Sequence, residues 1–180
     1  LGAIGSHMID AFRWLSGREV RAVTATLNTP TAFRERTLPD GSAKRPQTSD
    51  EQATLILEMD GGLHGVISLS AVAAGEVNRL AIHGTEGALV VDNHVQLWGR
   101  QRDGDLRLIP VPVEYEPLPW IPDENLLLGP FVKLAGLTVD QIHESALLPP
   151  PTFADGLAVQ RVLDAAYRSA STGQRVVIEQ

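Results

Sequence analysis

Short apolar runs separated by turn residues follow one another closely between residues 51 and 109, and this spacing constrains the fold more than any other feature. Apolar and polar residues alternate within the runs, which is the pattern of half-buried strands. Turn sequences such as Asp60-Gly61-Gly62 and Gly84-Thr85-Glu86-Gly87 join them. Parallel neighbours need long crossovers, so strands this close together pair in antiparallel fashion. The expected strands are 51–59, 65–72, 79–83, 89–91, 95–98 and 106–109.

Segments on either side add strands and two helices. β-branched residues predict a strand over Val20 to Leu27, and a last strand is expected over Arg175 to Ile178. The polar segment from Asn28 to Asp50 indicates a long excursion or a loose hairpin. Apolar spacing predicts a helix over Ser6 to Leu15, with Gly17 as its C′ residue. A longer helix follows Thr152, which opens a capping box.

Nine of the twelve prolines lie between Pro110 and Pro151, so this insert is not a regular sheet. Its middle, Asn125 to Leu148, has apolar residues at helical spacing and predicts one or two helices. The sum is an α+β fold with a mostly antiparallel open sheet and helices on one face. We expect one domain over residues 1–180, with the proline-rich insert at about 110–151.

Composition excludes several classes of function. The net charge of -7 disfavours nucleic acid and anionic membrane surfaces as partners, because both need a basic patch. No apolar run approaches the roughly 20 residues that span a bilayer. The chain has no cysteine, which removes disulfides and thiolate chemistry. A reducing compartment fits this absence, and we expect a cytoplasmic protein.

Three segments in order resemble one family. They are Gly2-Ala3-Ile4-Gly5-Ser6-His7-Met8-Ile9-Asp10 with Arg13-Trp14-Leu15, then Asn78-Arg79-Leu80 through Gly84-Thr85-Glu86-Gly87-Ala88-Leu89, then Phe153-Ala154-Asp155-Gly156-Leu157 through Gln160-Arg161-Val162-Leu163-Asp164-Ala165. Together they resemble the C-terminal domain of the glucose–fructose oxidoreductase / inositol dehydrogenase / MocA-like (Gfo/Idh/MocA) oxidoreductases.

The resemblance implies a two-domain parent. An N-terminal Rossmann domain would bind NAD or NADP, and this domain would shape the pocket for a sugar, polyol or related hydroxy compound. The chain has no Gly-x-Gly-x-x-Gly after a strand, and its start at Leu1 reads as the middle of a longer polypeptide. Alone it is therefore expected to be inactive. The resemblance also implies a homo-oligomer that pairs through the open sheet face.

His7 is the expected catalytic residue, because the first segment resembles the helix entry that carries the family's catalytic histidine. In the first turn of a helix that starts at Ser6, the positive end of the dipole favours its neutral, proton-accepting form. A capping or core histidine is the alternative. Asp10, one turn later, either orients His7, binds a substrate hydroxyl or is a surface or packing carboxylate.

One departure from the family favours a different reading. Family dehydrogenases often carry a carboxylate four residues before the histidine, where this chain has Ala3. The alternative is therefore a non-catalytic binding or oligomerisation module of the same fold. A separate subunit that completes a Rossmann chain is a third possibility.

Other candidates are less specific. Arg79 either faces the pocket or forms a cross-strand ion pair, and Lys133 and His143 in the insert are candidate substrate contacts. Asp155 is explained by the capping box, and Trp14 is expected in the core. No histidine follows His143-Glu144 at the spacing of a zinc motif, so we expect no metal site.

Overall fold

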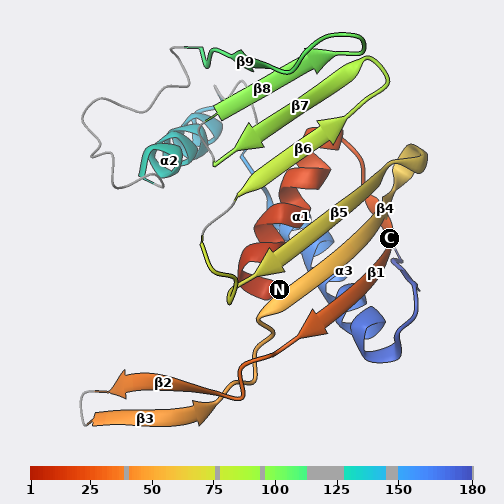
Figure 1. Cartoon of the computed structure of the whole chain (residues 1–180). Coiled ribbons are helices and arrows are strands. Elements are labelled where there is room, and N and C mark those ends of the chain that lie inside the picture. Colours follow the sequence, from red (N-terminus) through yellow and green to blue (C-terminus); the bar gives the residue numbers. More distant parts are fainter. Residues whose placement is uncertain (39–40, 76–77, 94–95, 113–127, 145–149, 180) are drawn as a thin grey trace. The chain divides into compact units, whose positions relative to one another are not determined.

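The computed structural model describes residues 1–38, 41–75, 78–93, 96–112, 128–144 and 150–179. These residues form two compact units (Figure 1). The first comprises Leu1–Ala73 and Pro151–Gln180, and the second comprises Ala74–Pro150. The single domain expected over residues 1–180 stays a prediction.

The first unit contains an antiparallel sheet in the order β10-β1-β4-β5. Its strands are β1 (Val20–Asn28), β4 (Gln52–Met59), β5 (His64–Ser70) and β10 (Val176–Val177). A short 3₁₀ turn, η1 (Asp60–Gly62), joins β4 to β5 at the predicted Asp-Gly-Gly turn. The helices α1 (Gly2–Ser16) and α3 (Phe153–Thr172) contact each other and one face of this sheet (Figure 1).

The core of the first unit lies between the sheet and these helices. Alternate residues of β4 face the helices, as the period of two predicts. The buried apolar residues include Ile9, Val23, Leu55, Leu57, Val162 and Ala165. The capping box of α3 is confirmed, since Thr152 and Asp155 exchange both of its hydrogen bonds. Gly173 ends the helix in the left-handed conformation.

The polar excursion after β1 is a hairpin of β2 (Phe33–Leu38) and β3 (Gly41–Pro46). It extends from the ends of β1 and β4 (Figure 1). The sequence indicated either a long excursion or a loose hairpin here, and the segment forms the hairpin.

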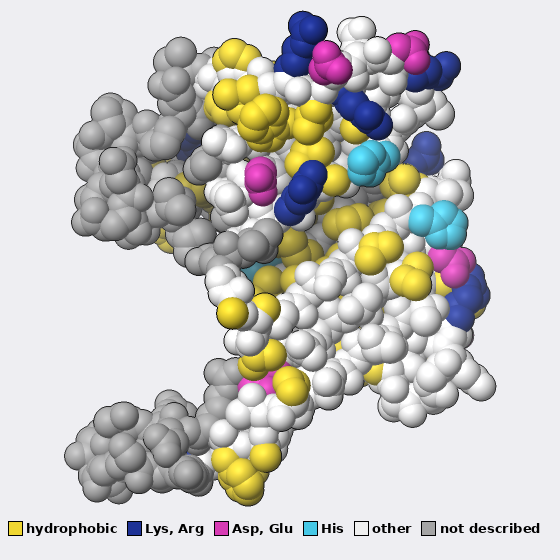
Figure 2. Space-filling model, in the orientation of Figure 1, with side chains coloured by type: hydrophobic (Ala, Val, Ile, Leu, Met, Phe, Trp, Pro, Cys, Tyr) yellow, Lys and Arg dark blue, Asp and Glu magenta, His cyan; other side chains and the backbone are white. Residues whose placement is uncertain are grey.

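The second unit holds a separate antiparallel sheet in the order β6-β7-β8-β9. Its strands are β6 (Arg79–His83), β7 (Gly87–Asp92), β8 (Gln96–Gln101) and β9 (Arg107–Ile109). Ile82 and Leu89 are register partners, and both are more than two-fifths exposed. Apolar side chains gather over this sheet (Figure 2). The helix α2 (Leu128–Ile142) lies where the insert was expected to be helical; residues 113–127 and 145–149 of the insert lie outside the described residues.

The α+β class with antiparallel open sheets is confirmed. The structure differs in having two four-stranded sheets where one was expected. After Ser70 the chain bends through residues 71–75 and does not reverse in a tight turn. Among the described strands, β5 therefore pairs only with β4, and β6 begins a new sheet.

Candidate functional site

The helix α1 has one face in the core and one face exposed. Gly5, Ile9 and Arg13 recur every four residues and are buried. Phe12 packs beside them against the core. Gly17 ends the helix at φ 60°, a left-handed conformation that suits glycine and confirms the predicted end.

A close approach fixes α1 on the sheet. The ring of Phe12 occupies the space where a side chain on Gly65 of β5 would begin, because a Cβ atom there would lie 2.4 Å from Phe12 Cε1. Real Cβ atoms do not approach carbon so closely, so β5 needs glycine at this point. Because Gly65 has no side chain, the ring of Phe12 packs directly against β5, and this contact keeps the buried face of α1 close to the sheet.

His7 lies on the opposite, exposed face of α1. Around it are Ile4, Trp14 and Leu15, whose exposed fractions are 54%, 76% and 44%. Within the described part of the chain His7 makes no hydrogen bond, so it is neither a capping nor a core histidine there. The expectation that Trp14 is a core residue is wrong. The residues of α1 that face the core are Gly5, Ile9 and Arg13, and Trp14 lies on the exposed face.

The start of α1 also differs from the expectation. The helix already includes Gly2 and Ala3, so Ser6 is not its N-cap and His7 lies at least in its second turn. The favourable field of a helix terminus falls off within the first turn. The expected place of His7, in the first turn at the positive end of the helix dipole, is therefore wrong.

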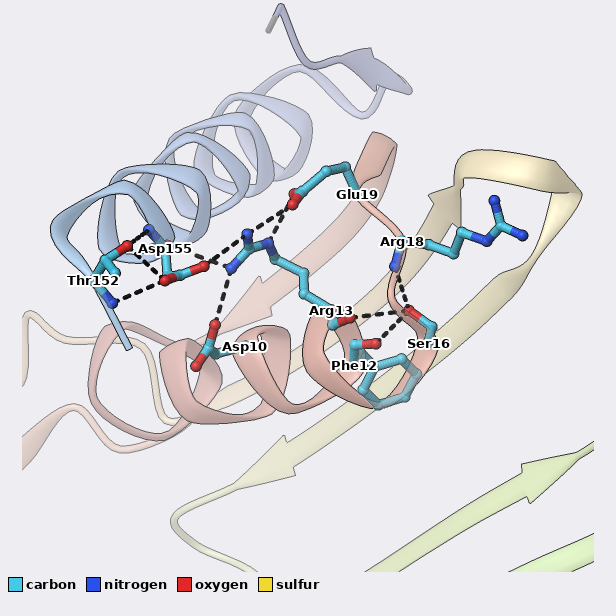
Figure 3. Close-up of polar contacts among 8 residues, drawn as sticks. All are labelled: Asp10, Phe12, Arg13, Ser16, Arg18, Glu19, Thr152 and Asp155. Atoms are coloured by element: carbon cyan, nitrogen blue, oxygen red, sulfur yellow. Dashed lines mark hydrogen bonds and ion pairs between the residues drawn. The ribbon is translucent and has the colours of Figure 1, made fainter. Parts of the chain in front are cut away.

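Arg13 is the centre of an ion-pair cluster between α1 and α3 (Figure 3). Its Nε and Nη2 donate to the two carboxylate oxygens of Glu19 at 2.8 and 2.7 Å. Its Nη1 donates to Asp10 Oδ1 at 2.9 Å, and its Nη2 lies 3.4 Å from Asp155 Oδ1. The side chain of Arg13 is only 9% exposed. The cluster joins the end of one helix to the capped start of the other.

These contacts shift the pKa values of the acidic and basic groups so that each charged form is favoured. The hydrogen bond from Arg13, and then its charge, lower the pKa of Glu19. The hydrogen bonds from the Thr152 side chain and backbone, with the charge of Arg13, lower the pKa of Asp155. The hydrogen bond to Glu19 raises the pKa of Arg13. All three groups are therefore held in their charged forms.

An open depression of about 280 Å³ lies over this cluster, with Trp14 and Arg18 in its lining. Three carboxylates of the cluster face two guanidinium groups there. A cofactor pyrophosphate would meet excess negative charge, so the depression does not fit that group. The start of α3 does not fit it either, because its own Asp155 already caps that terminus.

The other predicted site residues are placed as follows. Asp10 pairs with Arg13, which matches the packing alternative; a contact with substrate stays a prediction. Arg79 begins β6 directly opposite Asp92 and is exposed. Lys133 is exposed on α2, and His143 is exposed just after α2 ends. These three belong to the second unit, whereas His7 and Asp10 belong to the first.

Sequence reasoning missed Arg13 and Glu19. The i,i+3 spacing of Asp10 and Arg13 could have indicated their ion pair. Nothing in the sequence indicated that Asp155, from the last helix, completes the cluster.

The described residues hold no group of three or more His, Cys, Asp or Glu side chains that could bind a metal ion. No helix in the described ranges has both the length and the apolar character needed to cross a membrane.

Comparison with known proteins places these features in context. The family profile of the GFO/IDH/MocA C-terminal domain matches residues 1–90, which is half of the chain. An uncharacterized oxidoreductase of Synechocystis sp. is 32% identical over 93 residues, which cover 51% of this chain and 24% of that protein. The chain thus spans about a quarter of the length of this curated relative.

Solved structures match nearly the whole chain. An oxidoreductase domain protein from Kribbella flavida has a TM-score of 0.78 and 29% identity, over 99% of this chain and 49% of its own. A levoglucosan dehydrogenase in complex with NADH and levoglucosan has a TM-score of 0.81 and 27% identity, over 99% of this chain and 50% of its own. The chain spans about half of each of these proteins.

Proposed function

Because this chain belongs to the GFO/IDH/MocA family, as part of its C-terminal domain, we propose that it is the substrate-side half of an NAD(P)-dependent dehydrogenase. In this proposal a separate nucleotide-binding domain holds most of the cofactor. The substrate is a sugar, a polyol or a related hydroxy compound, and His7 accepts the proton of the hydroxyl group that is oxidised.

The exposure of His7 on α1 is the observation that carries the proposal. His7 has no partner among the described residues, and the apolar side chains around it are 44% to 76% exposed, so it lies on a surface suited to contact with a second domain. Burial of Trp14 and Ile4 under the cofactor-binding domain would also exclude water from the imidazole. Exclusion of water strengthens every polar interaction made there.

In this proposal the chain accepts the proton of the substrate, and the cofactor accepts the hydride. The nicotinamide, when bound, accepts a hydride from the carbon that carries the hydroxyl group. The neutral imidazole of His7 can take the hydroxyl proton in the same reaction. Two observations support this division: Ile4, Trp14 and Leu15 are exposed around His7, and the depression over the Arg13 cluster suits no phosphate.

The substrate class rests on similarity. The related levoglucosan dehydrogenase has been solved with levoglucosan and with L-sorbose, each together with NADH. Both compounds carry several hydroxyl groups, which need charged or amide partners in a pocket. We propose Asp10, Arg79, Lys133 and His143 as the side chains of this chain that provide them.

A homo-oligomer completes the proposal. The face of the first sheet that points away from the helices exposes Ile56, Val66 and Val177 at 47%, 64% and 59%. We propose that this face pairs with the same face of a second copy, as a two-fold assembly allows.

Ala3 favours a second candidate, a binding module that kept the fold without the enzyme. It lies one turn before His7 on the same helix face, and its methyl group offers no hydrogen bond to a hydroxyl. The two candidates differ in whether the parent protein reduces NAD(P).

The test uses the longer protein, with the coding region upstream of Leu1 included. His7→Ala and His7→Asn are compared with His83→Ala, which changes an exposed histidine of β6. Reduced cofactor is followed over a panel of sugars and polyols. We expect both His7 variants to lose about 10²–10⁴ in kcat, as removal of a general base does, with unchanged melting temperatures. Full turnover in His7→Ala would exclude the proposed role, and no turnover in the unchanged protein would support the binding module.

A further inference from the structure

The outer face of α1 carries a stripe of side chains that defines where a substrate can meet the helix. Its members follow one another at intervals of four, three and four positions, the spacing of a single helix face: Ala3, His7, Asp10 and Trp14. Within α1, all of which the structure describes, Asp10 is the only carboxylate. Ala3 offers no hydrogen-bonding side chain, so Asp10 is the one acidic acceptor that this stripe places beside His7.

The carboxylate of Asp10 has one oxygen engaged and one oxygen available. Its Oδ1 accepts a hydrogen bond from Arg13 Nη1 at 2.9 Å. Among the described residues no group donates to its Oδ2. An ionised carboxylate accepts hydrogen bonds at both oxygens. The side chain is 39% exposed, so a hydroxyl group of a bound molecule can reach the second oxygen.

The other contacts of Arg13 fix the guanidinium that holds Asp10. The side chain of Arg13 is only 9% exposed, and both carboxylate oxygens of Glu19 accept from it. Asp155 contacts it from the start of α3 (Figure 3). A planar guanidinium held in this way has a set direction for each of its N–H groups. Its hydrogen bond to Oδ1 therefore restricts the rotation of the Asp10 side chain, which is how a supporting residue orients a binding group.

We propose that Arg13 is a positioning residue: by holding Oδ1 of Asp10 it directs Oδ2 to a second hydroxyl group of the molecule whose first hydroxyl group gives its proton to His7. The inference rests on the proposed function, which supplies the roles of His7 and Asp10. Side chains three positions apart on a helix have Cβ atoms about 5–6 Å apart, so two hydroxyl groups of one sugar ring can meet both. The site then rejects compounds that lack the second hydroxyl group, because the carboxylate loses its donor.

The test measures binding to the longer protein, with the coding region upstream of Leu1 included. D-glucose, myo-inositol and levoglucosan are titrated, each beside its monodeoxy analogues, in the presence of NADH, which cannot accept a hydride from them. The ratio of the dissociation constants of an analogue and its parent compound reports the contribution of the missing hydroxyl group. In the unchanged protein we expect one hydroxyl group with a ratio of about ten or more, as for a hydrogen bond to a charged group.

Two variants test the path from Arg13 to that hydroxyl group. Asp10→Ala removes the acceptor and should bring the ratio to about one. Arg13→Lys should lower the ratio about threefold or more, since one ammonium group cannot hold Glu19 twice and Asp10 as well. In the double variant the ratio should fall no further than in Asp10→Ala alone, as expected when one residue acts through the other.

Ser169→Ala is the matched control for a loss of stability alone. The hydroxyl group of Ser169 is fully buried, accepts the backbone N–H of Ala25 at 2.9 Å and donates to Gln174 O at 2.6 Å. Its removal leaves two buried backbone groups without a partner and destabilises the first unit, but it touches no member of the Arg13 cluster. We expect this variant to keep the ratio of the unchanged protein.

The outcomes separate this role from the dehydrogenase itself. A ratio that Arg13→Lys lowers no more than Ser169→Ala does, or that Asp10→Ala leaves as it was, would overturn the role of Arg13 whether or not the protein turns over. Selective loss in Asp10→Ala and Arg13→Lys without any reduction of NAD(P) would support the positioning role and reject the proposed dehydrogenase. A longer protein that binds none of the three compounds would overturn the inference.

Discussion

Arg13 and Glu19 are joined by two hydrogen bonds, of 2.8 and 2.7 Å, across the turn at Gly17 that ends α1. The guanidinium and carboxylate groups match in shape, so the pair fixes direction as well as distance. The same guanidinium reaches Asp10 and Asp155, and so the exit of α1 and the start of α3 depend on one side chain.

Replacement of Arg13 is expected to destabilise the first unit. Arg13→Met keeps the length of the side chain but leaves Glu19, Asp10 and Asp155 facing one another without a cation. We expect a loss of about 2–4 kcal/mol in the free energy of unfolding, near the range for breaking a buried pair. Arg13→Lys should lose less, because it keeps the charge but not the double hydrogen bond. Urea unfolding measures both.

Arg161→Met is the control for these variants, since Arg161 is exposed on α3 and belongs to no ion pair among the described residues. It should change stability by less than about 0.5 kcal/mol, as exposed substitutions do. A loss in Arg13→Met no larger than this would mean that the cluster contributes nothing.

Acid should weaken the same cluster. The folded-state pKa values of Glu19 and Asp155 are lowered, so the folded protein binds fewer protons than the unfolded chain. This stability is present above the unfolded-state values, about 4.3 for Glu and about 3.9 for Asp, and is lost as the pH falls through the folded-state values. Urea unfolding from about pH 6 to about pH 3 should show the decline.

Glu19→Gln tests the source of that decline. The variant should be less stable than the unchanged protein at neutral pH, and the two curves should converge in acid, where Glu19 is protonated in both states. Glu179→Gln, at an exposed position near the end of the chain, should follow the unchanged curve. Curves for Glu19→Gln that stay parallel at every pH would contradict the assignment.

The strands and caps could be predicted because their causes are local. Alternation along Leu55, Leu57 and Met59 indicates β4, and Thr152 with Asp155 gives the capping box within four residues. Cross-chain contacts have no such signal. Asp155 meets Arg13 over 142 positions, and only the packing of α3 against α1 brings them together.

The error at Trp14 has a different cause. The helix α1 carries large apolar residues on both faces, so periodicity alone could not choose which face is buried. Two glycines determine which face is buried, because Gly5 on α1 and Gly65 on β5 allow the helix to pack closely against the sheet on that face. Small residues at contact points therefore indicate the buried face of this helix better than its large residues do.

The contact between Phe12 and Gly65 gives a sharp packing prediction. In Gly65→Ala the new methyl group would meet the ring at 2.4 Å, so the helix or the strand has to move. We expect a loss of about 1–3 kcal/mol, as for other overpacked cores. Phe12→Leu in the same chain should recover part of it, which a double-mutant cycle measures.

Gly156→Ala is the matched control, because a Cβ atom at this position of α3 has nothing within 4 Å. It should stabilise the protein by about 0.5–1 kcal/mol, since alanine loses less backbone entropy in a helix. Equal changes in the free energy of unfolding for Gly65→Ala and Gly156→Ala would show that the Phe12 ring does not require glycine at position 65.

The exposed face of the first sheet gives a prediction about assembly. Val66 is 64% exposed and its register partner Ile56 is 47% exposed, so Val66→Glu places a charge in the proposed interface without disturbing the core. We expect the dissociation constant of the oligomer to rise about tenfold or more, because a charge buried without a partner is costly. Val139→Glu, at an exposed valine of α2, should leave it unchanged. Equal association of both variants would remove this face from the interface.

Ala3 separates the dehydrogenase from the binding module. It is exposed one turn before His7, so Ala3→Asp places a carboxylate where it can accept a hydrogen bond from a substrate hydroxyl. If the longer protein is a dehydrogenase, kcat/KM should rise at least about tenfold, since a hydrogen bond to a charged group contributes about 1.5–3 kcal/mol. Gly2→Asp adds the same charge one position away on another face of α1 and should leave kcat/KM unchanged. Turnover that stays absent in Ala3→Asp, in a protein that folds and binds NAD(P), would favour the binding module, because the missing carboxylate would then not be what silences the site.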